Sequence, residues 1–518
     1  MPPLVTRSRP VRLRLPLAAL VLSALALGGA PRGHAQTSAN PGGSAATAAP
    51  APACSSDPGQ PSPQSAQDIL DSFAQQDPAS AAGAKATAAA YVAQFYPLWF
   101  TYYQSLPEKV LGTFNQLVGP DRVTPAYRYV VLINDDTIYA SAYLDLTAGP
   151  VILTIPPVTV NYSILALDPY GDIYDLKKTE LQPSPQGGVY ALVGPSGFSG
   201  TLPASVTHQV AMPLNAMTLI FRADRHAPDS TTDQTDLAKT FRSQLQLQTL
   251  TDYLSDPNGG PTKVVPVILF AFSFKQAADE LIARDPILFL RTLQQAVASP
   301  RTPPLSPFEQ VLSSRFDALF GNGVTRRAEF GAGARLAHAL IVDRYLTHTG
   351  PTNWVHFCNI GDWGGGTQVI DRSAITEFCQ YCNAISTAAY YHAFKDAAGY
   401  SLDGSNRRVY VLTFPQDQIP QAKRFWSLTA YTPDTVELIP NPAQKYLVAS
   451  YTPGLQPNPD GSLSIYMSPV RPPDVPSANW LPVSPGRFNV ALRIYGPEGN
   501  VGDNYDAGAY LPPGIQSR

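Results

Sequence analysis

Hydrophobic residues along the chain follow two periods in turn, which predict helical and stranded stretches. Apolar positions spaced three or four residues apart are typical of a helix, and strict alternation is typical of a half-buried strand. The helical spacing begins at 66–76 and 82–114, where Pro97 is expected to kink or restart the second helix. It returns after residue 235, where we expect helices over 277–284, 287–297, 306–320 and 328–347.

The last of these segments places a histidine on an apolar stripe. His338 shares one helical face with Ala334, Ile341 and Tyr345. A histidine among such neighbours usually belongs to the core, because the apolar stripe of a helix faces the protein interior. We therefore expect a structural role for His338.

Runs rich in Val, Ile and Tyr, broken by Gly, Pro and Asp, predict strands in two separate parts of the chain. Many short strands with turn residues between them are typical of a sandwich or barrel. The pattern therefore predicts an α+β fold with two antiparallel β-sandwich modules joined and flanked by helices. The expected strands are 127–133, 137–145, 151–155, 162–168, 188–193 and 218–221, and then 409–414, 425–431, 463–467 and 488–495.

The first 65 residues have a different composition. A basic start, an apolar stretch from Leu15 to Ala30 and a small residue at Ala35 predict a secretory signal peptide over 1–35. The apolar stretch is shorter than the roughly 20 residues that cross a membrane. We expect a soluble mature protein that is secreted or periplasmic and is not held in the membrane.

The remaining chain divides by composition and period. Residues 36–65 are rich in Ala, Pro, Ser and Gly and predict a flexible linker. We expect a helical start with the first β module over 66–225, a helical middle region over 226–400, and the second β module over 401–518.

Composition and charge exclude several classes of protein. The chain has 52 prolines in 518 residues, which excludes a helix bundle, and only 14% charged residues with 10% aromatic residues, which excludes a disordered chain. The formal charge is −3, and it becomes −8 because the predicted signal peptide removes five arginines and no acid. An acidic chain has no electrostatic footprint for nucleic acid, so we expect no nucleic-acid partner.

The four cysteines are expected to form disulfides if the protein is exported. Two residues separate Cys379 from Cys382, and His356 and Cys358 lie upstream. This spacing makes a metal site an alternative. Four cysteines allow three pairings. Because Cys54 lies in the predicted linker, we favour a pair among the other three, which leaves one thiol over.

Several motifs, in order along the chain, resemble proteins that carry the paired domains of unknown function 1254 and 1214. The resemblance extends from about residue 85 to 500 and implies two jelly-roll-like β domains joined by helices, but little about chemistry. The motifs of the first domain are Asn134 to Tyr139, Leu144 to Leu146, Gly149 to Val151 and Val193 to Pro195 with Gly200 to Pro203. Those of the second are Leu402 to Arg407, Phe425 to Leu428, Asp460 to Leu463, Asn479 to Pro482 and Leu492 to Tyr495.

The chain departs from the family pattern at two places, where a carboxylate replaces an amide. Asp135 stands where the family has the second Asn of Asn-Asn-Asp-Thr, and Asp172 stands where it has the Asn of Asp-x-Trp-x-Asn. The polar cluster that the resemblance carries over is Asn134, Asp136, Thr137, Tyr139 and Asp168.

These residues suggest a catalytic or binding site. Carboxylates in unlike surroundings can share general acid and base roles, so Asp136, Asp168 and Asp172 are the candidate catalytic residues, provided that they converge. Arg493 can hold a carboxylate or phosphate through two hydrogen bonds, and aromatic rings suit sugars or other flat ligands. The candidate binding residues are Asn134, Thr137, Tyr139, Tyr170, Trp426, Tyr446, Trp480 and Arg493. The structural alternative is that the acids cap turns and the tryptophans pack the core.

Two functions from different classes fit this pattern. The first is an exported hydrolase or lyase that acts on a carbohydrate or similar polar small molecule in an acidic and aromatic cleft between the modules. The second is a non-catalytic ligand-binding or cell-envelope protein. The chain has no G-x-S-x-G or H-E-x-x-H motif and no paired histidines in the β modules, so we assign no metal ligand and leave the cofactor unknown.

Overall fold

The computed structural model describes residues 64–111, 113–174, 185–228, 230–265, 273–321, 325–363, 368–502 and 510–518. Residues 50–518 belong to one compact unit, and the predicted signal peptide, most of the linker and Cys54 lie outside the described residues. Within the described ranges, every helix is too short or too polar to cross a membrane. The fold mixes helices and sheets, which confirms the α+β class.

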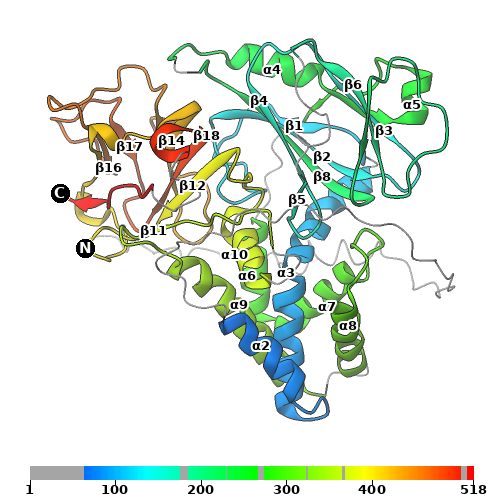
Figure 1. Cartoon of the computed structure of the whole chain (residues 1–518). Helices are drawn as coiled ribbons and strands as arrows, with labels where there is room; N and C mark the ends of the chain where they lie inside the picture. The colour runs from blue at the N-terminus through cyan, green and yellow to red at the C-terminus, as the bar shows by residue number, and fades with distance from the viewer. Residues whose placement is uncertain are drawn as a thin grey trace, which may run out of the picture. The chain divides into compact units, whose positions relative to one another are not determined.

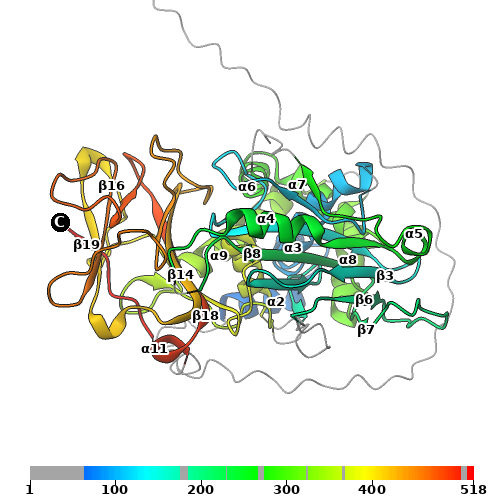
Figure 2. The same ribbon diagram turned by 90° about the horizontal axis from the view of Figure 1, so that it is seen from above.

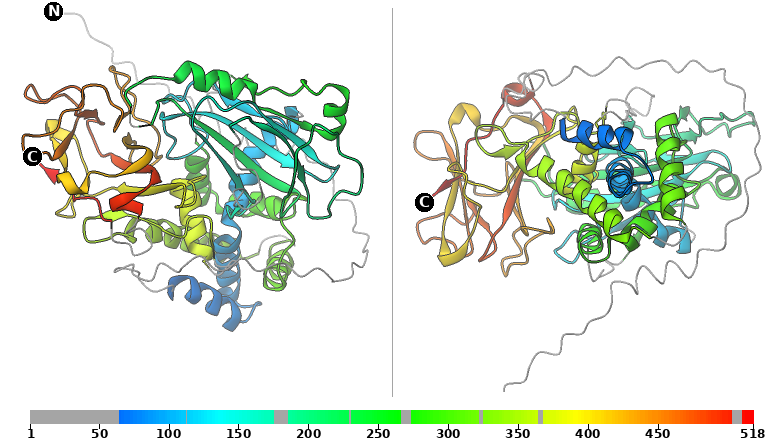
Figure 3. Two further views of the ribbon diagram at one scale, coloured as in Figure 1. Left: turned by 45° about the horizontal axis from the view of Figure 1, so that its top comes forward. Right: turned by 90° about the horizontal axis from the view of Figure 1, so that it is seen from below.

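Helix α3 (Ala81–Leu111) is the centre of the helical region. It packs against α2 (Gln64–Gln75), α7 (Pro286–Val297), α8 (Pro307–Phe320), α9 (Arg327–Thr347) and α10 (Val369–Cys379). Figure 1 shows these helices below the sheets, and the view from below shows them across the strands of the first module (Figure 3). The remaining helices are α4 (Thr235–Gln244), α5 (Leu250–Ser255), α6 (Phe274–Arg284) and α11 (Gly499–Gly502), with 3-10 turns at Ser405–Arg407 and Gln416–Gln418.

Pro97 lies inside α3 and does not end it, in contrast to the expected restart. A proline has no N–H, so the carbonyl four residues earlier loses its helical partner. Here that carbonyl belongs to Ala93, and it accepts a hydrogen bond from the Ser373 hydroxyl of α10 at 3.2 Å. Packing between the two helices thus replaces the hydrogen bond that the proline removes.

The first β module has two sheets around one core. The larger sheet has the order β10-β1-β2-β8-β4-β5 and the smaller has the order β7-β6-β3-β9. Apolar side chains from both sheets pack in the same cluster. The strands are β1 (Val118–Pro120), β2 (Thr137–Asp145), β3 (Val151–Ile155), β4 (Tyr162–Leu167), β5 (Ile173–Tyr174), β6 (Gly188–Val193), β7 (His208–Ala211), β8 (Ala216–Asp224), β9 (Gln246–Thr249) and β10 (Lys263–Val265).

The second β module is built in the same way. Its sheets have the orders β11-β12-β18-β14-β15 and β17-β16-β13-β19, again around one shared core. Seen from above, its strands form a group beside those of the first module (Figure 2). The strands are β11 (Trp354–Val355), β12 (Ala388–Ala393), β13 (Tyr410–Phe414), β14 (Ala422–Tyr431), β15 (Leu447–Ala449), β16 (Leu463–Ser468), β17 (Trp480–Pro482), β18 (Asn489–Pro497) and β19 (Gln516–Ser517). The jelly-roll connection stays a prediction.

Both modules recruit strands from the predicted helical middle region. Strand β9 pairs with β3 and β10 pairs with β1, although both follow residue 225. Strand β12 pairs with β18, although it precedes residue 401. The sheets are therefore completed by segments that come from outside the predicted ranges of the modules.

The expected strand over 127–133 is wrong. This segment has no strand in the structure, and Leu132 takes a positive φ of 55°. Its backbone bonds instead to the second module, because the Leu132 N–H donates to Val436 O at 3.0 Å and the Leu132 carbonyl accepts from Arg493. The apolar residues of this segment fill the junction between the modules and do not belong to a sheet.

Candidate functional site

A polar chamber lies where the outer faces of the two large sheets meet. Side chains alternate between the two faces of a strand, and in β2, β8, β12 and β18 one set of alternate residues packs in the core of its own module. The other set points away from that core and, together with 127–134 and 380–382, lines a cavity of about 50 Å³. From the strands, the lining residues are Tyr139, Ser141, Tyr143, Thr218, Ile220, Arg222, Tyr390, Arg493 and Tyr495.

Each module contributes one arginine, and each arginine lies opposite a tyrosine on the neighbouring strand. Arg222 of β8 is paired in register with Tyr139 of β2, and Arg493 of β18 is paired with Tyr390 of β12. Both guanidinium groups are buried, with residue exposures of 5% and 1%. The part of the lining that the structure describes contains no Asp or Glu, so we call this cavity the Arg–Tyr chamber.

Arg222 is a buried cation whose hydrogen-bond partners are all neutral. Its Nη1 donates to Asn383 Oδ1 at 2.9 Å and its Nη2 donates to the Tyr381 carbonyl at 2.6 Å. Its Nε is buried and has no hydrogen-bond partner among the described residues, where Arg222 also forms no ion pair with a carboxylate. Burying a charge without a counter-charge costs several kcal/mol of stability. No carboxylate among the described residues supplies that counter-charge to Arg222.

Arg493 is better compensated. Its Nη2 donates to the Leu132 carbonyl and the Tyr431 hydroxyl, and the carboxylate of Asp136 acts on it electrostatically. Its Nη1 is buried and, in the described part of the chain, lacks a hydrogen-bond partner. Each arginine therefore has one nitrogen that makes no hydrogen bond to the described residues.

Asp136 lies next to the chamber but is occupied by structural contacts. It accepts hydrogen bonds from Ser427 Oγ at 2.8 Å and from the Tyr451 hydroxyl. Burial raises the pKa of Asp136, while the two hydroxyl groups and the charge of Arg493 act to lower it. Asp136 thus joins the start of β2 to β14 and to the loop that follows β15, and it is not part of the chamber lining.

The other residues of the Asn134 motif form one hydrogen-bond network. Asn134 Oδ1 accepts from the Tyr139 hydroxyl at 3.0 Å and from Thr137 Oγ1 at 3.3 Å, and its Nδ2 donates to the Tyr495 hydroxyl at 3.1 Å. Burial raises the pKa of Tyr495 and of Tyr381 well above the ordinary value, so both hydroxyls keep their protons at neutral pH. The structure therefore brings four predicted residues together: Asn134, Thr137, Tyr139 and Arg493.

Asp168 and Asp172 lie together in a different place, at the turn between β4 and β5. Asp168 Oδ1 accepts from the backbone N–H groups of Tyr170 and Asp172 at 2.8 and 2.9 Å, as expected for an acid that caps a turn. Burial and the charge of Asp172 raise the pKa of Asp168 to about 7. Asp136 shares none of these partners, so the structure does not bring the three candidate acids together, and their catalytic role stays a prediction.

The remaining predicted binding residues have other contacts. Tyr170 donates to Glu309 Oε1 at 2.9 Å, and the guanidinium of Arg372 lies 4.2 Å above its ring. Trp426 packs in the core of the second module, and Trp480 Nε1 donates to the Ser468 carbonyl at 3.1 Å. Tyr446 is buried. None of these four lines the chamber, so their role in binding stays a prediction.

The prediction of a disulfide is confirmed for Cys379 and Cys382. Cys358 is also disulfide-bonded, so the expectation that one of these three cysteines stays a free thiol is wrong. Cys382 lines the chamber, and the bond closes the turn that presents the Tyr381 carbonyl to Arg222.

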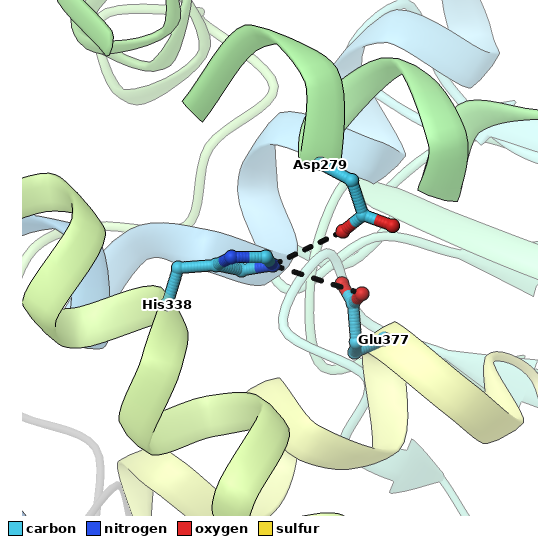
Figure 4. Close-up of side chains that lie close together, drawn as sticks. All are labelled: Asp279, His338 and Glu377. Carbon is cyan, nitrogen blue, oxygen red and sulfur yellow. Dashed lines mark ion pairs between the residues drawn. The ribbon is translucent and has the colours of Figure 1, made fainter. Parts of the chain in front are cut away.

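The helices hold a second polar cluster, which the sequence analysis did not identify. Asp279 of α6, His338 of α9 and Glu377 of α10 face one another (Figure 4). His338 Nε2 lies 3.1 Å from Asp279 Oδ1 and 3.7 Å from Glu377 Oε1. Burial acts to lower the pKa of His338, but the two carboxylates raise it to about 9. The structural role expected for His338 therefore does not account for these two acidic partners.

The fold and the chamber define a two-module α+β protein with one polar cavity at the junction. Residues 114–249 match the family model described as protein of unknown function DUF1254, and residues 387–499 match the one described as protein of unknown function DUF1214. The chain therefore matches both domains of this pair, the first in its N-terminal part and the second in its C-terminal part. A comparison with curated proteins found no match.

The fold is similar to that of a solved structure. The VPA0106 protein from Vibrio parahaemolyticus is 20% identical with a TM-score of 0.51, over 84% of this chain and all of that chain. A putative uncharacterized protein from Burkholderia cenocepacia is 17% identical with a TM-score of 0.38, over 88% of this chain and 93% of that chain. Arg222 lies in the first matched domain and Arg493 in the second, whereas Asp279, His338 and Glu377 lie outside both.

Proposed function

We propose that the protein binds a small organic anion, a carboxylate on a short apolar body, in the Arg–Tyr chamber. The observation that carries this proposal is the buried guanidinium of Arg222, which has only neutral partners among the described residues. A carboxylate can pair with a guanidinium through two charge-assisted hydrogen bonds, which are stronger than those between neutral groups. The ligand thus supplies the counter-charge that the lining lacks.

The rest of the chamber suits such a ligand. The protonated hydroxyl of Tyr495 accepts from Asn134 and can donate its own proton to an oxyanion, and Ile133 and Ile220 give an apolar wall. The volume of about 50 Å³ is roughly four times the ~10–15 Å³ that one water molecule needs. The chamber therefore fits a compact anion better than an oligosaccharide.

We propose binding without turnover rather than the reaction of a hydrolase or lyase. A general acid and base must reach the reacting atoms, but Asp136 is occupied by Ser427 and Tyr451, and Asp168 caps a turn elsewhere. A carbohydrate substrate remains the second candidate, favoured by the number of tyrosines around the chamber.

We also propose that the protein binds its ligand outside the cytoplasm. The basic and apolar segment over 1–35 supports export, and the Cys379–Cys382 disulfide is typical of an oxidising compartment. Cell fractionation with an antibody to the chain tests this: export predicts a mature protein about 35 residues shorter outside the cytoplasm, and an uncut cytoplasmic protein contradicts it.

Calorimetric titration with matched pairs of ligands tests the binding proposal. Acetate and propionate carry the carboxylate, while acetamide and propanamide have nearly the same shape without the charge. We expect heat of binding and a raised melting temperature with at least one acid and with neither amide. Equal binding of acid and amide, or binding of simple sugars alone, contradicts the proposal.

A further inference from the structure

We propose that Asp279, His338 and Glu377 form a binding site for a divalent transition metal of the Zn²⁺ class. One histidine and two carboxylates are a ligand set that such ions accept. The three side chains come from three different helices, and one ligand atom from each lies within 4.8 Å of the others (Figure 4). This site is separate from the Arg–Tyr chamber and does not depend on the function proposed for it.

Two of the ligand atoms form a close ion pair. His338 Nε2 and Asp279 Oδ1 are both buried and lie 3.1 Å apart, and the geometry of the contact is poor for a hydrogen bond. Two ligands of one zinc ion at bonds of about 2.0–2.2 Å are separated by about 3.4 Å in tetrahedral geometry. The separation therefore suits two atoms that share an ion, with little movement of either helix.

Glu377 is fixed by its neighbours. It is fully buried, and one of its oxygens accepts a hydrogen bond from the Tyr96 hydroxyl of α3. Its other oxygen contacts the ammonium of Lys275 and faces His338 at 3.7 Å. Such surrounding hydrogen bonds orient a carboxylate ligand before the ion arrives.

Lys275 places a second cation beside the two carboxylates, in addition to His338. Its Nζ bonds Asp279 Oδ2 at 2.9 Å and also Glu377, and it is 4% exposed. The ammonium therefore uses the oxygen of Asp279 that faces away from His338 and leaves Oδ1 available. It also competes with an ion for Glu377, so we expect its removal to strengthen metal binding.

An adjoining cavity gives access and open coordination positions. Lys275, Asp279 and His338 line a cavity of about 370 Å³, whose other walls include Phe378, Phe394 and Phe488. Metal sites that bind a substrate keep at least one position open to such a space. The geometry thus assigns the ion three protein ligands and leaves the remaining positions to water or a small molecule in the cavity.

Metal titration of the purified full chain tests the proposal. After treatment with EDTA, zinc binding is measured by competition with a chromogenic chelator, and cobalt binding is measured from its visible absorption. We expect one tight site in the wild type, an affinity at least about tenfold lower in Asp279→Asn and His338→Gln, and a higher affinity in Lys275→Met.

Two variants serve as matched controls. His208→Gln and Asp474→Asn change one histidine and one acid outside both the cluster and the adjoining cavity, and both should bind zinc as the wild type does. Circular dichroism shows that each variant is folded. The proposal is overturned if the wild type and Lys275→Met bind neither ion, or if Asp279→Asn and His338→Gln bind zinc as tightly as the controls.

Discussion

The Arg–Tyr chamber and the helical cluster are both buried and polar, but their charges are arranged differently. Arg222 in the chamber has no carboxylate partner among the described residues, whereas Lys275 and His338 in the helices face two carboxylates, Asp279 and Glu377. A buried cation alone favours an anion from outside, while paired carboxylates favour a cation. The difference teaches that burial alone does not indicate which ligand a site binds; the charges around the site do.

The two regions also differ in how the chain builds them. The chamber uses outward faces of strands in both matched domains, so any chain with these sheets can place side chains there. The helical cluster uses α6, α9 and α10, which lie outside the matched ranges. We infer that the chamber belongs to the paired domains, and that the cluster belongs to this chain's helical region.

The largest expected effect comes from breaking the balanced cluster. Glu377→Gln leaves the buried ammonium of Lys275 with one carboxylate and removes the charged acceptor of Tyr96. Loss of one partner of a buried ion pair costs about 3–5 kcal/mol, so we expect the free energy of unfolding in urea to fall by that amount. Asp434→Asn is the control, because its ion pair with Arg487 is exposed and worth about 0–1 kcal/mol. Equal losses in the two variants would refute the distinction.

A smaller effect is expected from opening the wall of the chamber. Replacing Cys379 and Cys382 together by alanine removes a cross-link over a very short loop, which costs about 2 kcal/mol in the chain-entropy model. The same change frees the Tyr381 carbonyl that holds Arg222, so anion affinity should also fall. Urea unfolding and calorimetry measure both quantities, and unchanged affinity in a destabilised variant would show that the turn does not position Arg222.

The smallest effect concerns pH and the acids outside the chamber. The pKa of Asp168 is raised to about 7, against about 3.9 in an unfolded chain. The folded state therefore binds the proton more tightly, and the contribution of Asp168 to stability falls as pH rises from about 4 to about 7. Asparagine can keep the turn hydrogen bonds without the charge.

We expect Asp168→Asn to gain about 1 kcal/mol relative to the wild type between pH 5 and pH 7.5, measured by urea unfolding. Asp145→Asn, at the far end of β2, is the control and should show no such trend. A gain that is larger at pH 5 would reverse the sign and contradict the assigned cause.

Local pattern predicted most of the secondary structure. Strand β2 has the expected bounds of 137–145, and helices α7 and α9 agree to within one residue at each end. The segment 127–133 was predicted wrongly because its apolar residues are buried by the other module, which a local period cannot show. Helix α3 likewise tolerates Pro97 because the Ala93 carbonyl accepts a hydrogen bond from Ser373, which is far away in sequence.

The candidate site was predicted in part. Asn134, Tyr139 and Arg493 were found because motifs carried them, but Arg222 was missed even though it interrupts a strand that is otherwise almost entirely apolar. A charged residue in such a strand was the available signal. Asp279, His338 and Glu377 carried no signal together, because only the packing of three helices brings them into contact.

Arg222→Met tests the central claim most directly, with Arg424→Met as its matched control. Both arginines come from strands at the junction, but Arg424 is paired with Asp224. Calorimetry with acetate and urea unfolding are applied to both variants. If Arg222 is the cation that binds the anion, Arg222→Met loses at least about tenfold in acetate affinity while its free energy of unfolding stays within about 1 kcal/mol, and Arg424→Met loses about 3–5 kcal/mol of stability. Undiminished acetate binding by a folded Arg222→Met protein would contradict the account.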